Sequence, residues 1–299
     1  MKAVSILIPV YNDDVVSQIS LLQHQCMSVE GLQWEIIVAD DGSTDGSAAV
    51  NAQINAIDGC SLVLRGKNYG RASTRNFLAR EAHYDTLIYI DSGLKPNPHF
   101  VENYVDNVDK ASVVCGNIAV DPHHIDMTNL RCRNEVKAQQ RFTADKHALE
   151  PYKNFHSGNF MVSRRVMLSY PMREDIKTYG YEDTLFGKQL AENNVSILHI
   201  DNPVLFTRFE SNERFLEKTR EGIGTLYKFR IELEGYSSLL HIVNLLKNLH
   251  LLWLPNVLYK YFERKMLDNL KSNHPKLIIF SLYRICLLGE KFSFNRCKP

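Results

Sequence analysis

Three short apolar segments of this chain each end abruptly in polar or acidic residues. The segments are residues 4–10, 35–39 and 86–90, and the residues that follow them are Tyr11-Asn12, Asp40-Asp41 and Asp91-Ser92. Apolar runs of this length are typical of buried strands. In an open sheet of parallel strands, ligands bind at the carboxyl ends of the strands. We therefore expect the three strand ends to lie together and to form one binding site.

Strands and helices alternate through the first 120 residues. We expect strands at 4–10, 35–39, 61–64, 86–90 and 112–120, and helices at 14–24, from 44, at 70–83 and at 98–108. This alternation predicts an α/β fold with a mainly parallel, doubly wound sheet. The middle of the chain is less regular, with strands expected at 160–163 and 197–200 and helices at 131–142 and 212–234. Residues 179–193 are expected to begin with an acidic loop and continue as a helix. From residue 238 the pattern is helical, with an interruption at Pro255.

The charges divide the chain into an acidic body and a basic C-terminal segment. Residues 241–299 hold ten Lys/Arg and three Asp/Glu, a net charge of +7, which leaves −6 for the rest because the whole chain carries +1. We predict an α/β domain over residues 1–235 and a basic amphipathic helical tail over residues 236–299. Such a helix can lie on an anionic membrane surface. The alternative is a tail that packs on the α/β domain and turns its basic side chains to solvent.

The spacing of the cysteines and the first residues of the chain indicate in which cellular compartment the protein is expected. No Cys-x-x-Cys pair occurs, so neither a zinc site nor a disulfide framework is expected. No signal-peptide pattern precedes the first strand, and no apolar run approaches the roughly 18 residues that span a bilayer. We expect a cytoplasmic protein with reduced thiols, which could attach peripherally to the inner face of the cytoplasmic membrane, and no nucleic-acid partner. The cysteines are Cys26, Cys60, Cys115, Cys132, Cys286 and Cys297.

Five motifs in a fixed order carry a family resemblance. Each motif is weak alone, because Asp and Gly also favour turns for local reasons. Together they resemble a family 2 glycosyltransferase with the GT-A fold, over about residues 1–235. Segments 114–116, 151–155, 158–160 and 198–204 resemble a bacterial subgroup that builds surface polysaccharides. The motifs are Ile8-Pro9-Val10-Tyr11-Asn12, Ala39-Asp40-Asp41-Gly42-Ser43-Thr44-Asp45, residues 68–76, Tyr89-Ile90-Asp91-Ser92-Gly93, and Gly180-Tyr181-Glu182-Asp183-Thr184.

The resemblance implies a binding site for a nucleotide-sugar donor, often a UDP-sugar. Pro9 and Tyr11 match residues beside the uridine, and Asp41 matches the carboxylate that accepts a hydrogen bond from the base. Arg75 matches a basic residue near the nucleotide, and its other interpretation is an arginine on a helix surface. Asp91 matches the first Asp of an Asp-X-Asp motif, which contacts the ribose or the sugar, or else is simply a capped strand end.

The resemblance also implies how transfer would proceed. Asp183 matches a catalytic base, because an inverting transfer needs a carboxylate that takes the proton of the acceptor hydroxyl. Glu182 would orient a sugar hydroxyl. The acceptor would be a glycan or a lipid-linked oligosaccharide. The other interpretation of both residues is an acidic helix N-terminus, where negative charge is favoured by the helix dipole.

Two positions depart from the family pattern. The third position of the Asp-X-Asp motif, which normally ligates Mg²⁺ or Mn²⁺, is Gly93, and no His follows the Asn-Pro-Val segment within residues 205–209. An Asp at the third position and a His after the Asn-Pro-Val segment would both be ligands of a hard cation. Three explanations stay open. Asp91 and the phosphates hold the metal alone, or a cationic side chain replaces its charge, or the protein no longer catalyses transfer. The candidate cationic residues are Arg71, Lys95 and Arg208.

Two other functions compete with transfer. The first is a nucleotide-sugar-binding pseudoenzyme that supports a partner transferase. The second is a nucleotidyltransferase, which also binds nucleotides on an α/β sheet. That function requires a glycine-rich basic loop after the first strand, and Asn12-Asp13-Asp14 is not one.

Overall fold

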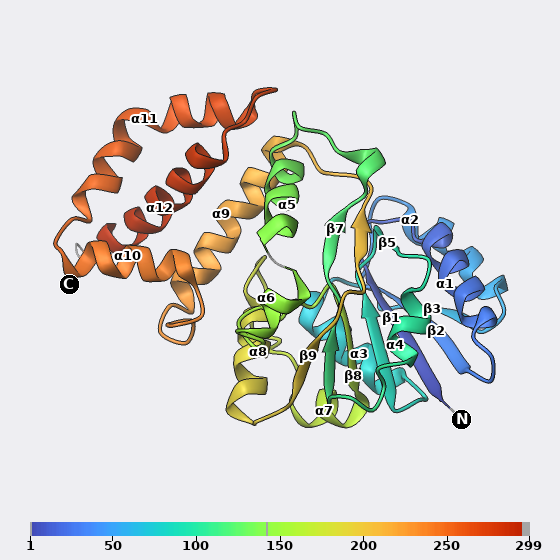
Figure 1. Cartoon of the computed structure of the whole chain (residues 1–299). Coiled ribbons are helices and arrows are strands. Elements are labelled where there is room, and N and C mark those ends of the chain that lie inside the picture. The colour runs from blue at the N-terminus through green and yellow to red at the C-terminus, as the bar shows by residue number, and fades with distance from the viewer. Residues whose placement is uncertain (1, 142, 295–299) are drawn as a thin grey trace. The chain divides into compact units, whose positions relative to one another are not determined.

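The computed structural model describes residues 2–141 and 143–294, and its path is shown in Figure 1. Phe142, Arg296, Cys297 and Lys298 therefore lie outside the described residues. The chain divides into two compact units, each described here by itself. The first comprises residues 1–124, 139–177 and 182–208, and the second comprises residues 125–138, 178–181 and 209–299. The domain boundary at residue 235 stays a prediction.

The first unit is built on a seven-stranded sheet with the order β3-β2-β1-β4-β8-β6-β9. Strands β1 to β4 are parallel, β8 runs antiparallel to β4 and to β6, and β9 runs parallel to β6. The predicted α/β class with a mainly parallel sheet is therefore confirmed. The strands are β1 Ala3–Val10, β2 Gln33–Asp40, β3 Cys60–Leu64, β4 Thr86–Ile90, β6 Val113–Cys115, β8 Asn159–Ser163 and β9 Ile197–His199.

Helices cover both faces of this sheet. Ile6 and Ile8 of β1 pack with α1 and α4 on one face, and Leu7 packs with α3, α7 and α8 on the other. Because both faces are buried, the strands read as continuous apolar runs instead of alternating apolar and polar residues. The helices of this unit are α1 Val16–Ser28, α2 Ser47–Asn51, α3 Arg71–Glu81, α4 Phe100–Val105, α6 Ala144–Ala148, α7 Arg164–Ser169 and α8 Glu182–Glu192.

The single strand predicted over residues 112–120 is wrong. The chain forms β6 there and then β7 (Ile118–Val120), which belongs to a separate three-stranded sheet with β5 (Leu94–Pro96) and β10 (Val204–Phe206). The chain leaves the main sheet at Gly116, where a Cβ atom would lie 2.3 Å from Asn159 Nδ2. That amide donates hydrogen bonds of 2.9 and 2.8 Å to the carbonyls of Asn117 and Asn202. A buried side-chain amide thus fixes the crossing between the two sheets.

The second unit is helical. Helix α12 (Leu277–Phe294) packs against α9 (Asn212–Lys228), α10 (Ser238–Asn248) and α11 (Trp253–Lys271), and most of α5 (Leu130–Arg141) belongs to the same unit. The interruption predicted at Pro255 is wrong, because the break between α10 and α11 falls at residues 249–252. Pro255 lies just beyond it, in the first turn of α11, where the missing N–H costs no hydrogen bond. Among the described residues, no helix combines the length and the apolar character needed to cross a bilayer.

Candidate nucleotide-sugar site

The carboxyl ends of β1, β2 and β4 lie at the same edge of the main sheet, as expected. Val10 is in register with Asp40, and Leu7 is in register with Tyr89. Pro9 is half-buried near the end of β1, and the Tyr11 side chain, just beyond it, is 46% exposed. An exposed aromatic ring at a strand end is available to contact a ligand. Its role beside a nucleotide stays a prediction.

Short polar bonds join the loops after β1 and β2. Asn12 adopts a left-handed backbone conformation with φ of 54°. Its N–H donates to Ser43 Oγ, and its Oδ1 accepts from the Thr44 N–H, both at 2.7 Å. Asp40 Oδ1 accepts from the N–H groups of Gly42 and Ser43 at 3.0 and 2.8 Å. The two loops therefore form one rigid rim at this edge.

Asp41 is buried and its carboxylate already accepts several hydrogen bonds. Arg65 Nη1 donates to Asp41 Oδ1 at 2.9 Å, and the N–H groups of Tyr69 and Gly70 donate at 2.8–3.1 Å. A carboxylate has about four lone-pair positions, so little capacity remains for a base. The structure therefore gives Asp41 a clear part in holding residues 65–70. Its predicted contact with the base stays a prediction.

Arg65 was not identified from the sequence. Its guanidinium also donates to Thr74 Oγ1 at 2.7 Å and lies 4.4 Å from the Tyr69 ring centroid and 4.9 Å from that of Phe77. The only signal in the sequence is its position, one residue after the end of β3. Arg65 thereby joins the third parallel strand end to the rim.

Arg75 and Asp91 form the ion pair at the centre of this edge. Arg75 Nη2 donates to Asp91 Oδ1 at 2.5 Å. Arg75 is only 2% exposed, and its Nε and Nη1 make no hydrogen bond within the described part of the chain. Buried donors without partners are costly, so their presence points to an anionic group that completes the site. The interpretation of Arg75 as a surface arginine is therefore wrong.

Glu182 and Asp183 open helix α8. Arg71 Nη1 lies 3.5 Å from Glu182 Oε1, while the buried Oε2 of Glu182 makes no hydrogen bond among the described residues. Burial raises the pKa of Asp183 to about 6, and the neighbouring charge of Glu182 adds to the rise. Hydrogen bonds from Thr184 and the charge of Arg75 oppose it. A carboxylate with a raised pKa that still ionises near neutral pH suits a general base.

The residues around Gly93 do not fit a divalent cation. Within the described ranges, no group of three or more His, Cys, Asp or Glu side chains could hold a metal ion. Gly93 has no side chain, and Asp91 is already paired with Arg75. A Cβ atom on Gly93 would lie 3.1 Å from Arg208 Nη2 and 3.0 Å from Asp13 Oδ2, and these two side chains form an ion pair. A cationic side chain therefore adjoins the position where the usual ligand would project.

The family model described as "Glycosyl transferase family 2" matches residues 5–169, more than half of the chain. The chain belongs to glycosyl transferase family 2. This assignment confirms the resemblance carried by the five motifs.

Curated relatives of this family 2 glycosyltransferase include bacterial transferases. The chain is 31% identical over 123 residues to the undecaprenyl-phosphate 4-deoxy-4-formamido-L-arabinose transferase of Klebsiella pneumoniae, a match covering 40% of this chain and 37% of the relative. It is 32% identical over 124 residues to the transferase of the same name from Salmonella choleraesuis, covering 40% and 37%. The match thus spans little more than a third of these relatives' length.

Solved structures share the GT-A fold with this glycosyltransferase. The mannosyltransferase PcManGT from Pyrobaculum calidifontis, solved with GDP-Man and Mn²⁺, aligns with a TM-score of 0.60 at 13% identity, covering 98% of this chain and 87% of that one. S. aureus TarS 1–349 in complex with UDP aligns with a TM-score of 0.52 at 15% identity, covering 99% and 92%. At these identities the likeness concerns the fold, and the predicted GT-A fold is confirmed.

Three histidines cluster in the first unit of this glycosyltransferase. The His147 ring centroid lies 5.2 Å from that of His199 and 6.4 Å from that of His156. Burial lowers the pKa of His156 to about 4, and the neighbouring His147 and His199 add to the lowering. The cluster is therefore neutral at physiological pH. The spacing of the three histidines in the sequence does not predict that they cluster.

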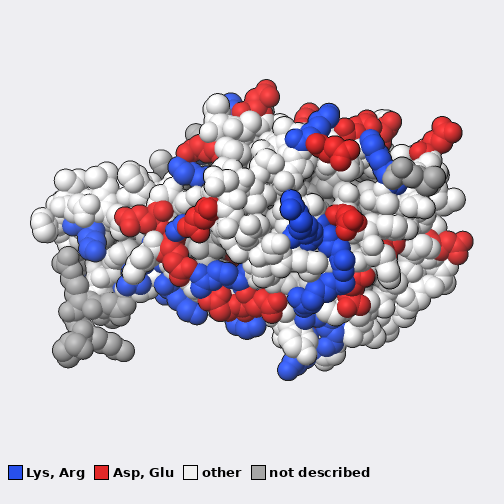
Figure 2. Space-filling model, turned by 90° about the horizontal axis from the view of Figure 1, so that it is seen from below, with Lys and Arg blue, Asp and Glu red and all other residues white. Residues whose placement is uncertain are grey.

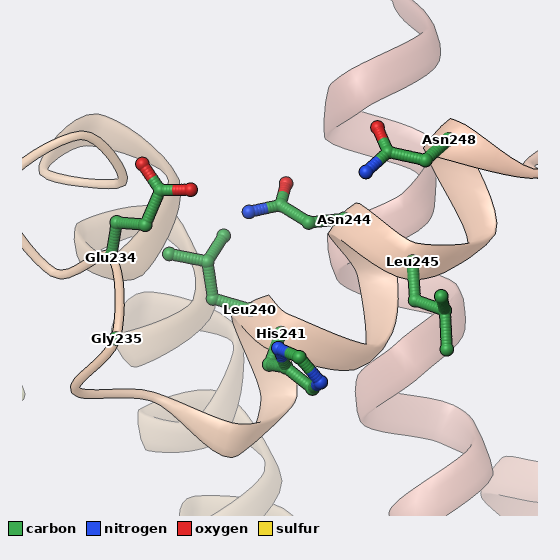
Figure 3. Close-up of a pocket in the computed structure, with 7 residues that line it drawn as sticks. All are labelled: Glu234, Gly235, Leu240, His241, Asn244, Leu245 and Asn248. Carbon is green, nitrogen blue, oxygen red and sulfur yellow. The ribbon is translucent and has the colours of Figure 1, made fainter.

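A separate pocket lies in the helical unit of the glycosyltransferase. Figure 3 shows Glu234 and Asn244 pointing toward one another beside Leu240, with His241 and Asn248 also in its lining. None of the residues that match the family motifs lines it. We therefore place the candidate site at the strand ends, where the family motifs lie together with the buried Arg75 guanidinium, its partner Asp91 and the Asp183 carboxyl with its raised pKa.

We predict that Asp41→Asn lowers the free energy of unfolding by about 3 kcal/mol, because it leaves the buried Arg65 guanidinium without its counter-charge. Urea denaturation followed by circular dichroism measures this change. The matched control is Asp58→Asn, at an exposed carboxylate near β3, which should leave the midpoint almost unchanged. Equal midpoints for the wild type and Asp41→Asn would show that the Arg65 pair does not hold this rim.

Proposed function

We propose that this family 2 glycosyltransferase moves a sugar from a nucleoside diphosphate donor to a glycan or lipid-linked acceptor in surface-polysaccharide synthesis, with inversion at the anomeric carbon. One observation carries the proposal. At the edge where the parallel strands end, the buried Arg75 has free donors and pairs with Asp91, and its charge reaches Asp183, whose pKa is raised to about 6. The site thus offers donors for an anionic ligand beside a carboxylate suited to proton transfer.

The relatives support the choice of donor. TarS was solved with UDP and with UDP-GlcNAc, and the Pyrobaculum mannosyltransferase with GDP-Man. We favour a UDP-sugar, with Pro9, Tyr11 and Asp41 at the uridine. The names of the curated relatives include undecaprenyl phosphate, which supports a lipid-linked acceptor.

The proposed transfer is a single displacement. The acceptor hydroxyl oxygen attacks the anomeric carbon while the bond from that carbon to the β-phosphate oxygen breaks. Asp183 takes the hydroxyl proton, and the nucleoside diphosphate leaves with the bonding electrons. Glu182, whose Oε2 makes no hydrogen bond among the described residues, orients a sugar hydroxyl. In this proposal Asp183 provides the base, and Glu182 provides the orientation of the sugar.

The alternative is a pseudoenzyme that binds a nucleotide sugar and supports a partner transferase. Gly93, in place of the usual metal ligand, is the observation that favours it. A screen of UDP- and GDP-sugars for nucleoside diphosphate release, with a polyprenyl-linked sugar as acceptor, separates the two functions. Release from at least one donor supports transfer. Binding of a donor without release supports the pseudoenzyme.

We predict that Asp183→Asn reduces kcat by about 10²–10⁴-fold and leaves UDP affinity unchanged, because the amide cannot accept the proton. Steady-state kinetics and calorimetric titration with UDP measure the two effects. Glu192→Gln removes a carboxylate from the far end of the same helix and should keep wild-type turnover. Near-normal turnover of Asp183→Asn would mean that the acceptor needs no deprotonation, as for a phosphate oxygen, and would reject Asp183 as the base.

The same assignment predicts the dependence of kcat/KM on pH. Asp183 must be ionised to act as a base, and its pKa is raised to about 6. As the pH falls below about 6 the ionised fraction declines, so kcat/KM should decline by about tenfold per pH unit. Profiles between pH 4.5 and about 8 measure this decline, and Asp183→Asn should have no such step. An Asp183→Asn profile with the wild-type step would assign the step to another group.

We also propose that the helical unit attaches the protein to the anionic inner face of the cytoplasmic membrane. Exposed apolar side chains recur at helical spacing within α10 and again within α11, and Leu249 lies in the break between the two helices. Figure 2 shows few charged residues over part of this end of the chain. The exposed Lys247, Lys260 and Lys265 lie in the same segment. Basic residues of this kind favour anionic lipid headgroups. The apolar set is Ile242, Leu245, Leu249, Trp253, Leu254, Val257 and Tyr261.

We predict that the full chain floats with phosphatidylglycerol vesicles in a density gradient and that the double substitution Leu249→Glu with Trp253→Glu does not. Each large apolar side chain contributes about 1.5–3 kcal/mol when it leaves water, and the new charges repel the headgroups. Ile231→Glu is the matched control, since Ile231 is 78% exposed but lies outside this set. It should float like the wild type. Flotation of the double variant would show that this surface does not bind the membrane.

A further inference from the structure

The two departures from the family pattern meet in space. Gly93 lies two residues after Asp91, and Arg208 lies in the stretch where relatives of the family were expected to carry a His. A Cβ atom on Gly93 would lie 3.1 Å from Arg208 Nη2 and 3.5 Å from its Nε. Gly93, which replaces the usual carboxylate, thus lies next to the guanidinium of Arg208. This arrangement is expected if the guanidinium replaces a metal ion.

Asp13 holds this guanidinium and leaves much of it accessible. The Arg208 side chain is 59% exposed and that of Asp13 is 17% exposed. The Asp13 backbone is itself fixed, because its carbonyl accepts a hydrogen bond of 2.8 Å from Asn51 Nδ2. A guanidinium has five N–H donors in a rigid fork, so a carboxylate on one side leaves other donors for a phosphate.

The other two candidate cations are less suited to this position. Lys95 Nζ lies 3.5 Å from Asp121, whose pKa is lowered by the His123 N–H and by Lys95. Arg71 lies 3.5 Å from Glu182. Neither contact involves Gly93. Among the three side chains, Arg208 is the one that adjoins the place of the missing ligand.

We propose that Arg208, positioned by Asp13, binds the diphosphate of the donor in place of a divalent cation, so that donor binding does not depend on Mg²⁺ or Mn²⁺. The inference rests on the proposed function, since it assumes a nucleoside diphosphate at this site. The pairs Arg75–Asp91 and Arg208–Asp13 together carry two positive and two negative charges. One divalent cation held by two carboxylates carries the same charges.

Arg208 has the geometry and charge for this task. The leaving nucleoside diphosphate gains negative charge as the sugar departs, and a cation that stabilises it lowers the barrier. Arginine binds phosphate through two parallel N–H···O bonds, which gives both strength and direction. Arg208 is therefore a binding residue for the diphosphate, and Asp13 is a positioning residue that acts through it.

Substitution of Gly93 is a poor test. Gly93 has φ of +75°, a conformation that side chains rarely adopt, and any Cβ would press on Arg208 and Asp13. The better test changes Arg208 and measures binding of UDP and of uridine by calorimetry, in EDTA and in Mg²⁺, with GDP and guanosine in parallel. Comparison of a nucleoside with its diphosphate isolates the contribution of the phosphates.

The wild type should bind UDP, or GDP if that is its donor nucleotide, with equal affinity in EDTA and in Mg²⁺. Arg208→Gln should weaken diphosphate binding by about 10–100-fold and leave nucleoside binding unchanged, and Arg208→Lys should lie between. Lys95→Gln removes a nearby positive charge and should bind like the wild type. Thermal melting of each variant confirms that it folds.

Four results would overturn the inference. Diphosphate binding that requires Mg²⁺ or Mn²⁺ would do so and leave the proposed transfer intact. An equal loss of nucleoside and diphosphate binding in Arg208→Gln, or a similar loss in Lys95→Gln, would show that Arg208 does not act on the diphosphate. Absence of binding of both UDP and GDP under all conditions would remove the proposed function and the inference together.

Discussion

A guanidinium buried at the edge of a sheet needs a carboxylate beside it, and the Arg75–Asp91 ion pair meets that need here. The Arg75 side chain is 2% exposed and that of Asp91 is 38% exposed, so loss of Asp91 would leave a buried charge without its partner. The pair joins helix α3 to the end of β4, and the Tyr89 hydroxyl donates to the Arg75 carbonyl at 2.9 Å. Arg75 also opposes the rise in the pKa of Asp183. The buried Arg75 thus holds the end of β4, has donors for a ligand and lowers the pKa of the proposed base Asp183.

The sequence was most informative where a physical constraint acts on a whole segment. The parallel strands β1 and β4 and the second half of β2 are largely buried on both faces, so these segments are mostly apolar, and acidic or polar residues mark their carboxyl ends. Their carboxyl ends were therefore predicted to within one residue, while β2 begins two residues before its predicted start. A helix was also predicted within residues 179–193 after an acidic loop, and α8 begins at the acidic residue Glu182 itself.

The sequence was least informative where contacts join distant segments. Strands β5, β7 and β10 have three residues each, too few for a periodic pattern, and they form a sheet only because their neighbours bring them together. Arg65 and Arg208 have no local motif, and their importance follows from what lies beside them. Gly93 was recognised as a departure from the sequence alone, but its nearness to Arg208 and Asp13 required the fold.

The central claim is that the strand ends bind a nucleoside diphosphate without a bridging metal ion. A crystal structure obtained with UDP and MnCl₂, with data collected at the manganese absorption edge, tests it directly. The account predicts the diphosphate against Arg208 at the edge formed by β1, β2 and β4, with no anomalous peak between Asp91 and the phosphates. A manganese peak bridging Asp91 and the diphosphate, or UDP bound instead in the pocket beside Leu240, would contradict it.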